Sequence, residues 1–516
     1  MTKKVNIFLV FFIHLAFQNY FAQVPAIQWQ KSVGGTYYDY SYAIVQAADS
    51  GFVFAGSSSS NTNDIPLNYG LDDYVLVKTN YLGVIQWEHS YGGSDYDVAY
   101  CVNKTNDGGY ILCGQASSNN IDLTVNYGDS DYWIVKTNSL GVMQWQRSYG
   151  GSGEDNGSWI IQTNDGGYII SGYATSNNVD VTNNHGLGDY WTVKTNSLGV
   201  IQWQKTYGGS SLDYGGKILQ TTDGGYIICG TSKSNDGDVS GNHGLEDYWI
   251  VKTSNLGVIQ WQKSYGGSGN DYGQDIKQTS DGGYIVCGKS NSTNGDINDN
   301  HGNNDYWVVK IDNLGTIQWK KSYGGSLFDN ANSVIQTTDG GYLIAGQSNS
   351  IDGDKTFTNG SYDNWLVKVN SAGTIVWTKD FGGSAYEDCK ALIPTLDGSY
   401  AVCGESISND VDVSGNHGGD DMWVVKFNSP LGIKENKISN TVSFFPNPSK
   451  NEITINAQKE NEFVLLTIED LFGKTVYSSP IDGQTTFNFN LENGVYLLRI
   501  KEQNNKEAFT KLIISK

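Results

Sequence analysis

Residues 213–267 read DYGGKILQTTDGGYIICGTSKSNDGDVSGNHGLEDYWIVKTSNLGVIQWQKSYGG, and this stretch decides the fold. It contains four runs rich in β-branched and aromatic residues, separated by turn sequences such as DGG and NLG. Short runs of this kind between glycine turns predict antiparallel strands. Tryptophans at intervals of 58 residues mark seven copies of the unit, namely Trp29, Trp87, Trp145, Trp203, Trp261, Trp319 and Trp377.

Four antiparallel strands in each of seven copies predict the blades of a β-propeller. The two ends of the array complement each other, because residues 26–32 form an isolated fourth strand and the last copy stops after its third strand at 422–427. The N-terminal strand can therefore complete the seventh blade and leave no free sheet edge. An open solenoid of stacked sheets is the alternative. We expect an all-β chain with the propeller over residues 24–432.

The order of motifs within each copy also resembles a known family. The block GGS, an acidic residue, a strand, DGGY, a strand ending in glycine and a Ser-rich stretch is similar to the seven-bladed β-propeller repeat of secreted bacterial proteins. The resemblance covers residues 24–432 and implies the fold, but it implies no activity.

The first 22 residues predict a signal peptide. Lys3 and Lys4 precede the apolar run 7–17, and a short polar stretch ends at Ala22, where we expect cleavage. The alternative is a membrane anchor, but the run is shorter than the ~20 apolar residues of a spanning helix. We expect no transmembrane segment in the mature chain. With 33 basic and 54 acidic residues, the formal charge of −21 argues against binding to nucleic acid.

The composition changes after the last repeat. A polar linker at 433–441 leads into residues 442–516, whose short strands and turns predict a small Ig-like β-sandwich. This segment resembles the type A C-terminal sorting domain of the type IX secretion system of Bacteroidota. The resemblance implies recognition by the secretion machinery and its sortase, and a secreted or outer-membrane-attached product. The residues that carry it include Pro446, Asn447, Pro448, Gly473, Gly494, Tyr496 and Lys511.

An acidic residue lies just before the first strand of every repeat. In a propeller this strand is innermost, so seven carboxylates could circle one mouth of the channel and bind a cation or a basic ligand. The alternative, which we favour, is that each carboxylate caps its own turn by accepting backbone N–H groups. The seven are Asp39, Asp97, Asp155, Asp213, Asp271, Asp329 and Glu387.

The long loop between the second and third strands partly matches a calcium-binding loop in two repeats. The last ligand is Asp rather than the usual Glu, and its alternative role is to cap the entry to the third strand. Calcium is therefore the only cofactor that the sequence suggests. The candidate ligands are Asp236, Asp238, Ser240 and Asp247 in one repeat, and Asp410, Asp412, Ser414 and Asp421 in another.

Four histidines share one turn position in different repeats, so we interpret them as turn residues rather than as zinc ligands. They are His185, His243, His301 and His417.

Function is expected where the repeat varies, because the regular positions are explained by structure. Trp159 has no tryptophan counterpart in the other repeats and is a candidate ligand contact. No catalytic triad, metal motif or phosphate loop is found, so no catalytic residue is assigned and enzymatic activity is left open. We interpret the chain as a secreted or cell-surface binding module for a glycan or protein. The alternatives are a carbohydrate-active enzyme with its site at the channel mouth, and a structural surface component without a specific ligand.

Overall fold

The structure is a computed structural model of the whole chain. It describes residues 24–355, 357–428, 442–447, 449–457, 463–470, 475–481, 486–502 and 507–515. The predicted signal peptide (1–22) and linker (433–441) lie outside these residues.

The repeat quoted above folds into one four-stranded antiparallel sheet, blade four. Its strands are β14 (Asp213–Gln220), β15 (Tyr226–Ser232), β16 (Asp247–Thr253) and β17 (Ile259–Tyr265), and they pair in that order. The DGG turn between β14 and β15 places Gly224 at φ +84°, a left-handed conformation that glycine adopts without steric cost. The turn residues therefore set the boundaries of the strands.

Five further repeats form sheets of the same order, as the sequence predicts. Blade one is β2 (Asp39–Gln46), β3 (Phe52–Ser58), β4 (Asp73–Thr79) and β5 (Ile85–Tyr91). Blade two is β6 (Asp97–Lys104), β7 (Tyr110–Ala116), β8 (Asp131–Thr137) and β9 (Met143–Tyr149). Blade three is β10 (Asp155–Gln162), β11 (Tyr168–Ala174), β12 (Asp189–Thr195) and β13 (Ile201–Tyr207). Blade five is β18 (Asp271–Gln278), β19 (Tyr284–Ser290), β20 (Asp305–Ile311) and β21 (Ile317–Tyr323). Blade six is β22 (Asp329–Gln336), β23 (Tyr342–Ser348), β24 (Asp363–Val369) and β25 (Ile375–Phe381).

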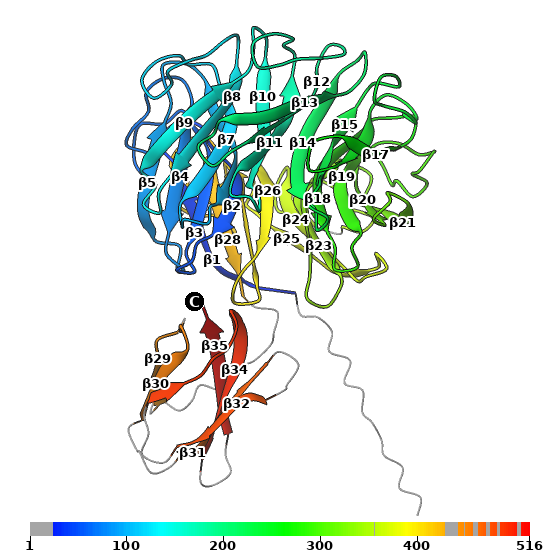
Figure 1. Cartoon of the computed structure of the whole chain (residues 1–516). Coiled ribbons are helices and arrows are strands. Elements are labelled where there is room, and N and C mark those ends of the chain that lie inside the picture. Colours follow the sequence, from blue (N-terminus) through cyan, green and yellow to red (C-terminus); the bar gives the residue numbers. More distant parts are fainter. Residues whose placement is uncertain are drawn as a thin grey trace, which may run out of the picture.

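Blade seven joins the two ends of the repeat array. It consists of β26 (Glu387–Pro394), β27 (Tyr400–Ser406), β28 (Asp421–Phe427) and β1 (Ile27–Val33), with β1 antiparallel to β28. Apolar side chains of this blade, among them Met422 and Val424, share one buried cluster with Ile44 and Phe54 of blade one. The ring is therefore closed, and it is not an open solenoid (Figure 1).

The third strand of each blade forms the centre of the core, and β16 is buried along its whole length. Trp249 on this strand is fully buried against Tyr190 of the preceding blade, with ring centroids 4.6 Å apart. The hydroxyl of Tyr190 donates to the carbonyl oxygen of Trp249 at 3.0 Å. Regular tryptophans on this strand therefore pack neighbouring blades together. All six cysteines are buried and free.

The C-terminal segment has its own core. One sheet is β29 (Val442–Phe445), β30 (Glu452–Ala457) and β33 (Thr486–Asn488). The other pairs β32 (Thr475–Pro480), β31 (Phe463–Glu469), β34 (Gly494–Glu502) and β35 (Glu507–Ile514) in that order. Buried residues from both sheets, including Ile453, Phe487, Leu466 and Leu498, form a single cluster. The immunoglobulin-like topology of this domain stays a prediction.

Candidate functional site

The acidic residues that begin the first strands are turn caps. The side chains of all seven are fully buried, at 0% exposure. In each blade the second glycine of the preceding GG pair donates its N–H to the carboxylate at 2.7–2.9 Å. This burial favours the turn-cap interpretation over a ligand-binding ring, because a fully buried carboxylate is not accessible to a ligand. A ligand-binding ring stays a prediction for Asp39, Asp97, Asp155, Asp213, Asp271, Asp329 and Glu387.

A second buried carboxylate lies at each blade junction, on the first residue of the third strand. One oxygen accepts an N–H from its own loop, whereas Oδ1 has no hydrogen-bond partner in the described part of the chain. A Cβ atom on Gly208 would lie 2.5 Å from Oδ1 of Asp189 and 2.7 Å from Oδ2 of Asp213. The carboxylates of two neighbouring blades therefore both lie against this glycine. The residues are Asp73, Asp131, Asp189, Asp247, Asp305, Asp363 and Asp421.

This burial changes the protonation of the junction residues. Burial raises the pKa of Asp131 to about 7. The backbone N–H of Tyr127 opposes the increase, while Asp155 and Asp180 of the next blade add to it. The junctions therefore contain carboxyl groups that bind protons near neutral pH.

The oxygens of the two candidate calcium loops serve other groups in the structure. Asp236 accepts the N–H of Ser210 at 2.7 Å, Ser240 accepts the amide of Gln262 at 2.6 Å, and Asp247 is buried. The second loop is alike, because Asp410 accepts the N–H of Ser384 at 2.8 Å. Over the described ranges, no three His, Cys, Asp or Glu side chains gather so that they could hold a metal ion. Calcium binding stays a prediction.

Asp238 and Asp412 accept, at 3.4 Å, the N–H of the first glycine of a GG pair. Ser414 accepts the amide of Gln30 on β1 at 2.5 Å, and Asp421 is buried like Asp247.

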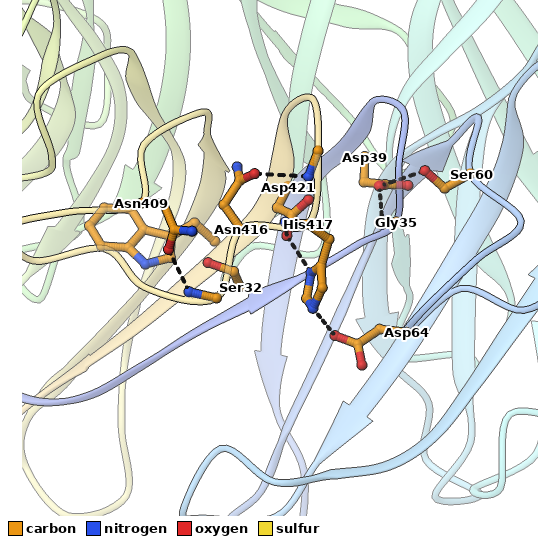
Figure 2. A network of polar contacts seen from close by, with 12 residues as sticks. Ser32, Gly35, Asp39, Ser60, Asp64, Asn409, Asn416, His417 and Asp421 are labelled. Carbon is orange, nitrogen blue, oxygen red and sulfur yellow. Dashed lines mark hydrogen bonds and ion pairs between the residues drawn. The ribbon is translucent and has the colours of Figure 1, made fainter.

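The four turn histidines remain in separate blades, each beside the aspartate four residues later. The Nδ1 atom of His417 lies 2.8 Å from Oδ2 of Asp421, and its Nε2 atom lies 3.9 Å from Asp64 of blade one (Figure 2). Asp64 also pairs with Lys31 on β1 at 3.3 Å. These polar contacts link the first and last blades, which fits a structural role for the histidine.

The channel holds a cavity of about 600 Å³. Its wall includes Trp159, the residue that the sequence analysis singled out. The fourth residue of every first strand also lines it, so all seven blades contribute. Aromatic lining residues are Tyr42, Tyr100, Tyr173, Tyr214 and Tyr272. The polar and charged lining residues are Gln115, Glu154, Asn156, Ser158, Lys217, Thr231, Gln274, Asn332 and Lys390.

A charged cluster lies behind one side of this wall. The ammonium of Lys217 lies 4.6 Å from the centre of the Trp159 ring and 3.1 Å from Oδ2 of Asp275. Asp275 is fully buried, and its Oδ1 lies 2.7 Å from the ammonium of Lys277. Burial would raise the pKa of Asp275, but the two lysines hold it below its ordinary value. Asp275 is therefore an ionised carboxylate shared by two cations.

Lys390 on the opposite side of the channel has carboxylates of its own. Its ammonium lies 2.5 Å from Asp388 and 3.6 Å from Glu405, both of which are buried. Burial would lower the pKa of Lys390, yet these two acids raise it above its ordinary range. Burial also raises the pKa of Glu405 to about 7, although Lys390 opposes the increase.

Trp159 stands out in the sequence as the only tryptophan at its repeat position, whereas Lys217 and Asp275 carry no such signal by themselves. All three occupy the same position of the repeat, the fifth residue of the first strand. The other blades carry Ala43, Cys101, Ser333 and Ala391 there. A comparison of this position across the repeats would have revealed the cluster.

The described sorting-signal residues lie on or next to strands of the C-terminal domain. Asn447 accepts the N–H of Ile513 at 2.8 Å, so the PNP motif is tied to the last strand. Gly494 begins β34, and the hydroxyl of Tyr496 donates to the carbonyl oxygen of Glu492 at 3.0 Å. Pro446 follows β29 and Lys511 lies on β35, whereas Pro448 and Gly473 are outside the described residues.

Comparisons with known proteins identify the C-terminal segment. Residues 443–515 match the secretion system C-terminal sorting domain family, Por_Secre_tail. A comparison of the chain with curated proteins gives no match. In the described part of the chain, no helix has the length and apolar character of a membrane span.

Solved structures are similar only at low identity. The extracellular domain of the putative hybrid two-component system BT4673 from B. thetaiotaomicron is 11% identical, with a TM-score of 0.38 over 95% of this chain and 60% of that one. Sqt1 from Chaetomium thermophilum is 9% identical, with a TM-score of 0.37 over 78% and 100%. A puromycin hydrolase is 8% identical, with a TM-score of 0.39 over 91% and 58%.

The chain thus spans about 60% of the length of the BT4673 domain, and a likeness at this level concerns the fold alone. The family match and the blade topology together establish the organisation of the protein. It is a seven-bladed β-propeller followed by a type IX secretion C-terminal sorting domain, which directs it to the cell surface or the medium.

Proposed function

We propose that the protein is an exported binding module whose ligand occupies the channel cavity. The observation that carries this proposal is the variation between blades along the cavity wall. The third strand begins with Asp in all seven repeats, whereas the fourth residue of the first strand has six different identities. In blade order these lining residues are Tyr42, Tyr100, Ser158, Gly216, Gln274, Asn332 and Lys390.

This contrast has a physical reason. The regular positions make the same contacts in every blade, so one residue type suits all seven copies. The cavity wall has no such constraint, because its residues face the channel. A wall of seven copies that differ therefore supports a site that recognises one asymmetric ligand.

The chemistry of the wall favours a glycan as this ligand. The tyrosine rings offer apolar faces, and their hydroxyls, together with the amides of Gln274 and Asn332, offer hydrogen-bond donors and acceptors. A sugar ring presents the same combination of apolar faces and hydroxyls. The volume of about 600 Å³ lies within the usual range for small-molecule sites.

A glycan array probed with the full chain without residues 1–22 tests the proposal. We expect saturable binding that Gln274→Ala weakens about tenfold, since this exposed side chain faces the cavity. The control is Ser139→Ala, in an exposed turn outside the cavity lining, which should bind like the wild type. Binding that both variants retain would place the ligand elsewhere.

Blade seven favours a second candidate function, glycoside hydrolysis. Asp388 and Glu405 are cross-strand partners on β26 and β27, and Glu405 has a pKa raised by burial to about 7. A pair of carboxyl groups, one of them with a raised pKa, is the usual catalytic arrangement for this reaction. New reducing ends on an array ligand, absent with Glu405→Gln, would support this candidate. If neither glycan binding nor hydrolysis is observed, a structural surface component without a specific ligand is the remaining interpretation.

We also propose that the secretion system's sortase removes the C-terminal domain after export. The order of sorting motifs at the end of the chain supports this step. Mass spectrometry of the exported protein would test it. A product that ends before residue 442 is expected, and a product that retains 443–515 would contradict the proposal.

A further inference from the structure

Building on the proposed function, we infer that the glycan in the cavity carries a carboxylate, which binds at Lys217. The ligand class is therefore an acidic oligosaccharide that contains uronic acid or a similar sugar.

The buried carboxylate of Asp275 is shared by two lysines. Two ammonium groups, those of Lys217 and Lys277, share the single carboxylate of Asp275 at 3.1 and 2.7 Å. The hydroxyl of Ser333 and the N–H of Val334 also donate to Asp275, each at 3.0 Å. The cluster thus contains one positive charge more than it has negative charges, within a chain whose formal charge is −21.

The cavity wall contains three charged residues. They are Glu154, Lys217 and Lys390. Lys390 contacts two carboxylates, Asp388 and Glu405. Lys217 instead divides one carboxylate with another lysine, so it is the lining cation whose charge is least compensated. A cation withdrawn from water needs a compensating anion, and a ligand carboxylate would supply it.

Lys217 is held in a fixed position at the cavity wall. Its side chain is 12% exposed and is held between the Trp159 ring and Asp275. An ammonium has three N–H donors, and the contact with Asp275 uses one of them. The lysine is therefore fixed in place before the ligand arrives, with donors left for a carboxylate. Trp159 and Asp275 are positioning residues in this arrangement.

The repeat shows that the cluster is not needed for the fold. At the position of Lys217 and Asp275, blades one, two, six and seven use Ala43, Cys101, Ser333 and Ala391. Blades with small, uncharged residues there form the same four-stranded sheets. The charged cluster is thus a local addition to one side of the cavity, which a neutral sugar would not require.

The test uses the full chain without residues 1–22 and an array of uronic-acid oligosaccharides, each printed beside its carboxyl-reduced form. We expect the acidic member of a pair to bind at least about tenfold more tightly, because a charge-assisted contact is lost on reduction. Its affinity should fall as salt is added, whereas that of the reduced form should not.

Matched variants then locate the contact. Lys217→Met keeps an unbranched side chain against Trp159 and should remove the preference for the acidic member. Lys205→Met changes an exposed lysine outside the cavity lining and should keep it. Glu154→Gln removes a lining carboxylate and should strengthen acidic binding several-fold.

The outcomes separate the two proposals. Equal binding of both members, or a preference for the reduced form, would overturn this inference while the glycan-binding function stands. Failure of every acidic and reduced member to bind would overturn the inference, and it would count against the proposed function as well. The wild-type comparison needs no variant, so it holds even if Lys217→Met does not fold.

Discussion

Replacing Asp131 by Asn should stabilise the propeller, and by more at pH 8 than at pH 5. Asp131 is buried at the junction of blades two and three, and its Oδ1 has no hydrogen-bond partner in the described residues. The titratable groups that face it are Asp155, Asp180 and, from its own loop, Tyr127.

The sign follows from the pKa. In the folded protein it is about 7, above the ordinary value of 3.8. The stabilising effect of this group is therefore complete below about pH 4 and is lost as the pH rises through 7. Asn resembles the protonated acid at every pH. The stability of the variant relative to the wild type should thus increase from pH 5 to pH 7 and then stay constant up to pH 8.

The magnitude follows from the same shift. A change of roughly three pKa units corresponds to about 4 kcal/mol at 1.36 kcal/mol per unit. Solvent screening at the junction reduces this to about 2 kcal/mol. For a propeller of this size, that corresponds to an increase in Tm of roughly 2–4 °C at pH 8.

Differential scanning calorimetry at pH 5, 6, 7 and 8 is the assay. Asp107→Asn in the same blade is the control, because Asp107 is exposed and pairs with Lys136 at 2.8 Å. Several hydrogen bonds and Lys136 outweigh its modest burial and lower its pKa to about 2, so its contribution is constant from pH 5 to 8. A difference between Asp131→Asn and wild type that is the same at pH 5 and pH 8 would refute the reasoning.

Three further predictions concern the core, calcium and export. Trp249→Ala should cost about 3–5 kcal/mol in urea unfolding, and more than Trp203→Ala, because Trp249 is fully buried and Trp203 is half-buried. If the loop sites bind calcium, adding it should raise the Tm in calorimetry, and the double variant Asp238→Ala, Asp412→Ala should lose the increase; an increase that the variant keeps would place calcium elsewhere. Deleting residues 443–515 should leave the chain inside the outer membrane in cell fractionation, and export of the deleted chain would contradict the assignment.

Most of the fold could be predicted from the sequence because glycine turns mark the strand boundaries in every repeat. The expected end strands at 26–32 and 422–427 agree within one residue with β1 and β28. The 58-residue spacing gave the number of blades, and the complementary ends gave the closure. Glycine turns and buried tryptophans act locally, so a pattern of residues is enough to reveal them.

The candidate site was harder to predict because a bulge interrupts each first strand. The pairing of β14 with β15 shifts between Gly215 and Ile218, and that of β18 with β19 shifts between Gly273 and Asp275. A strictly alternating strand would place Gly216 and Lys217 on opposite faces, yet both line the cavity. The ion pair of Lys217 with Asp275 also joins two blades, which only the assembled ring brings together.

The pairing of β1 with β28 has a consequence for how the molecule is made. Ile27 lies opposite Phe427. The first strand therefore cannot pair until almost the whole propeller has been synthesised. Each of the first six blades can fold from its own neighbouring residues. The seventh forms last, and it joins the six local units into one closed ring. Blade seven therefore forms only in a chain that contains both β1 and β28.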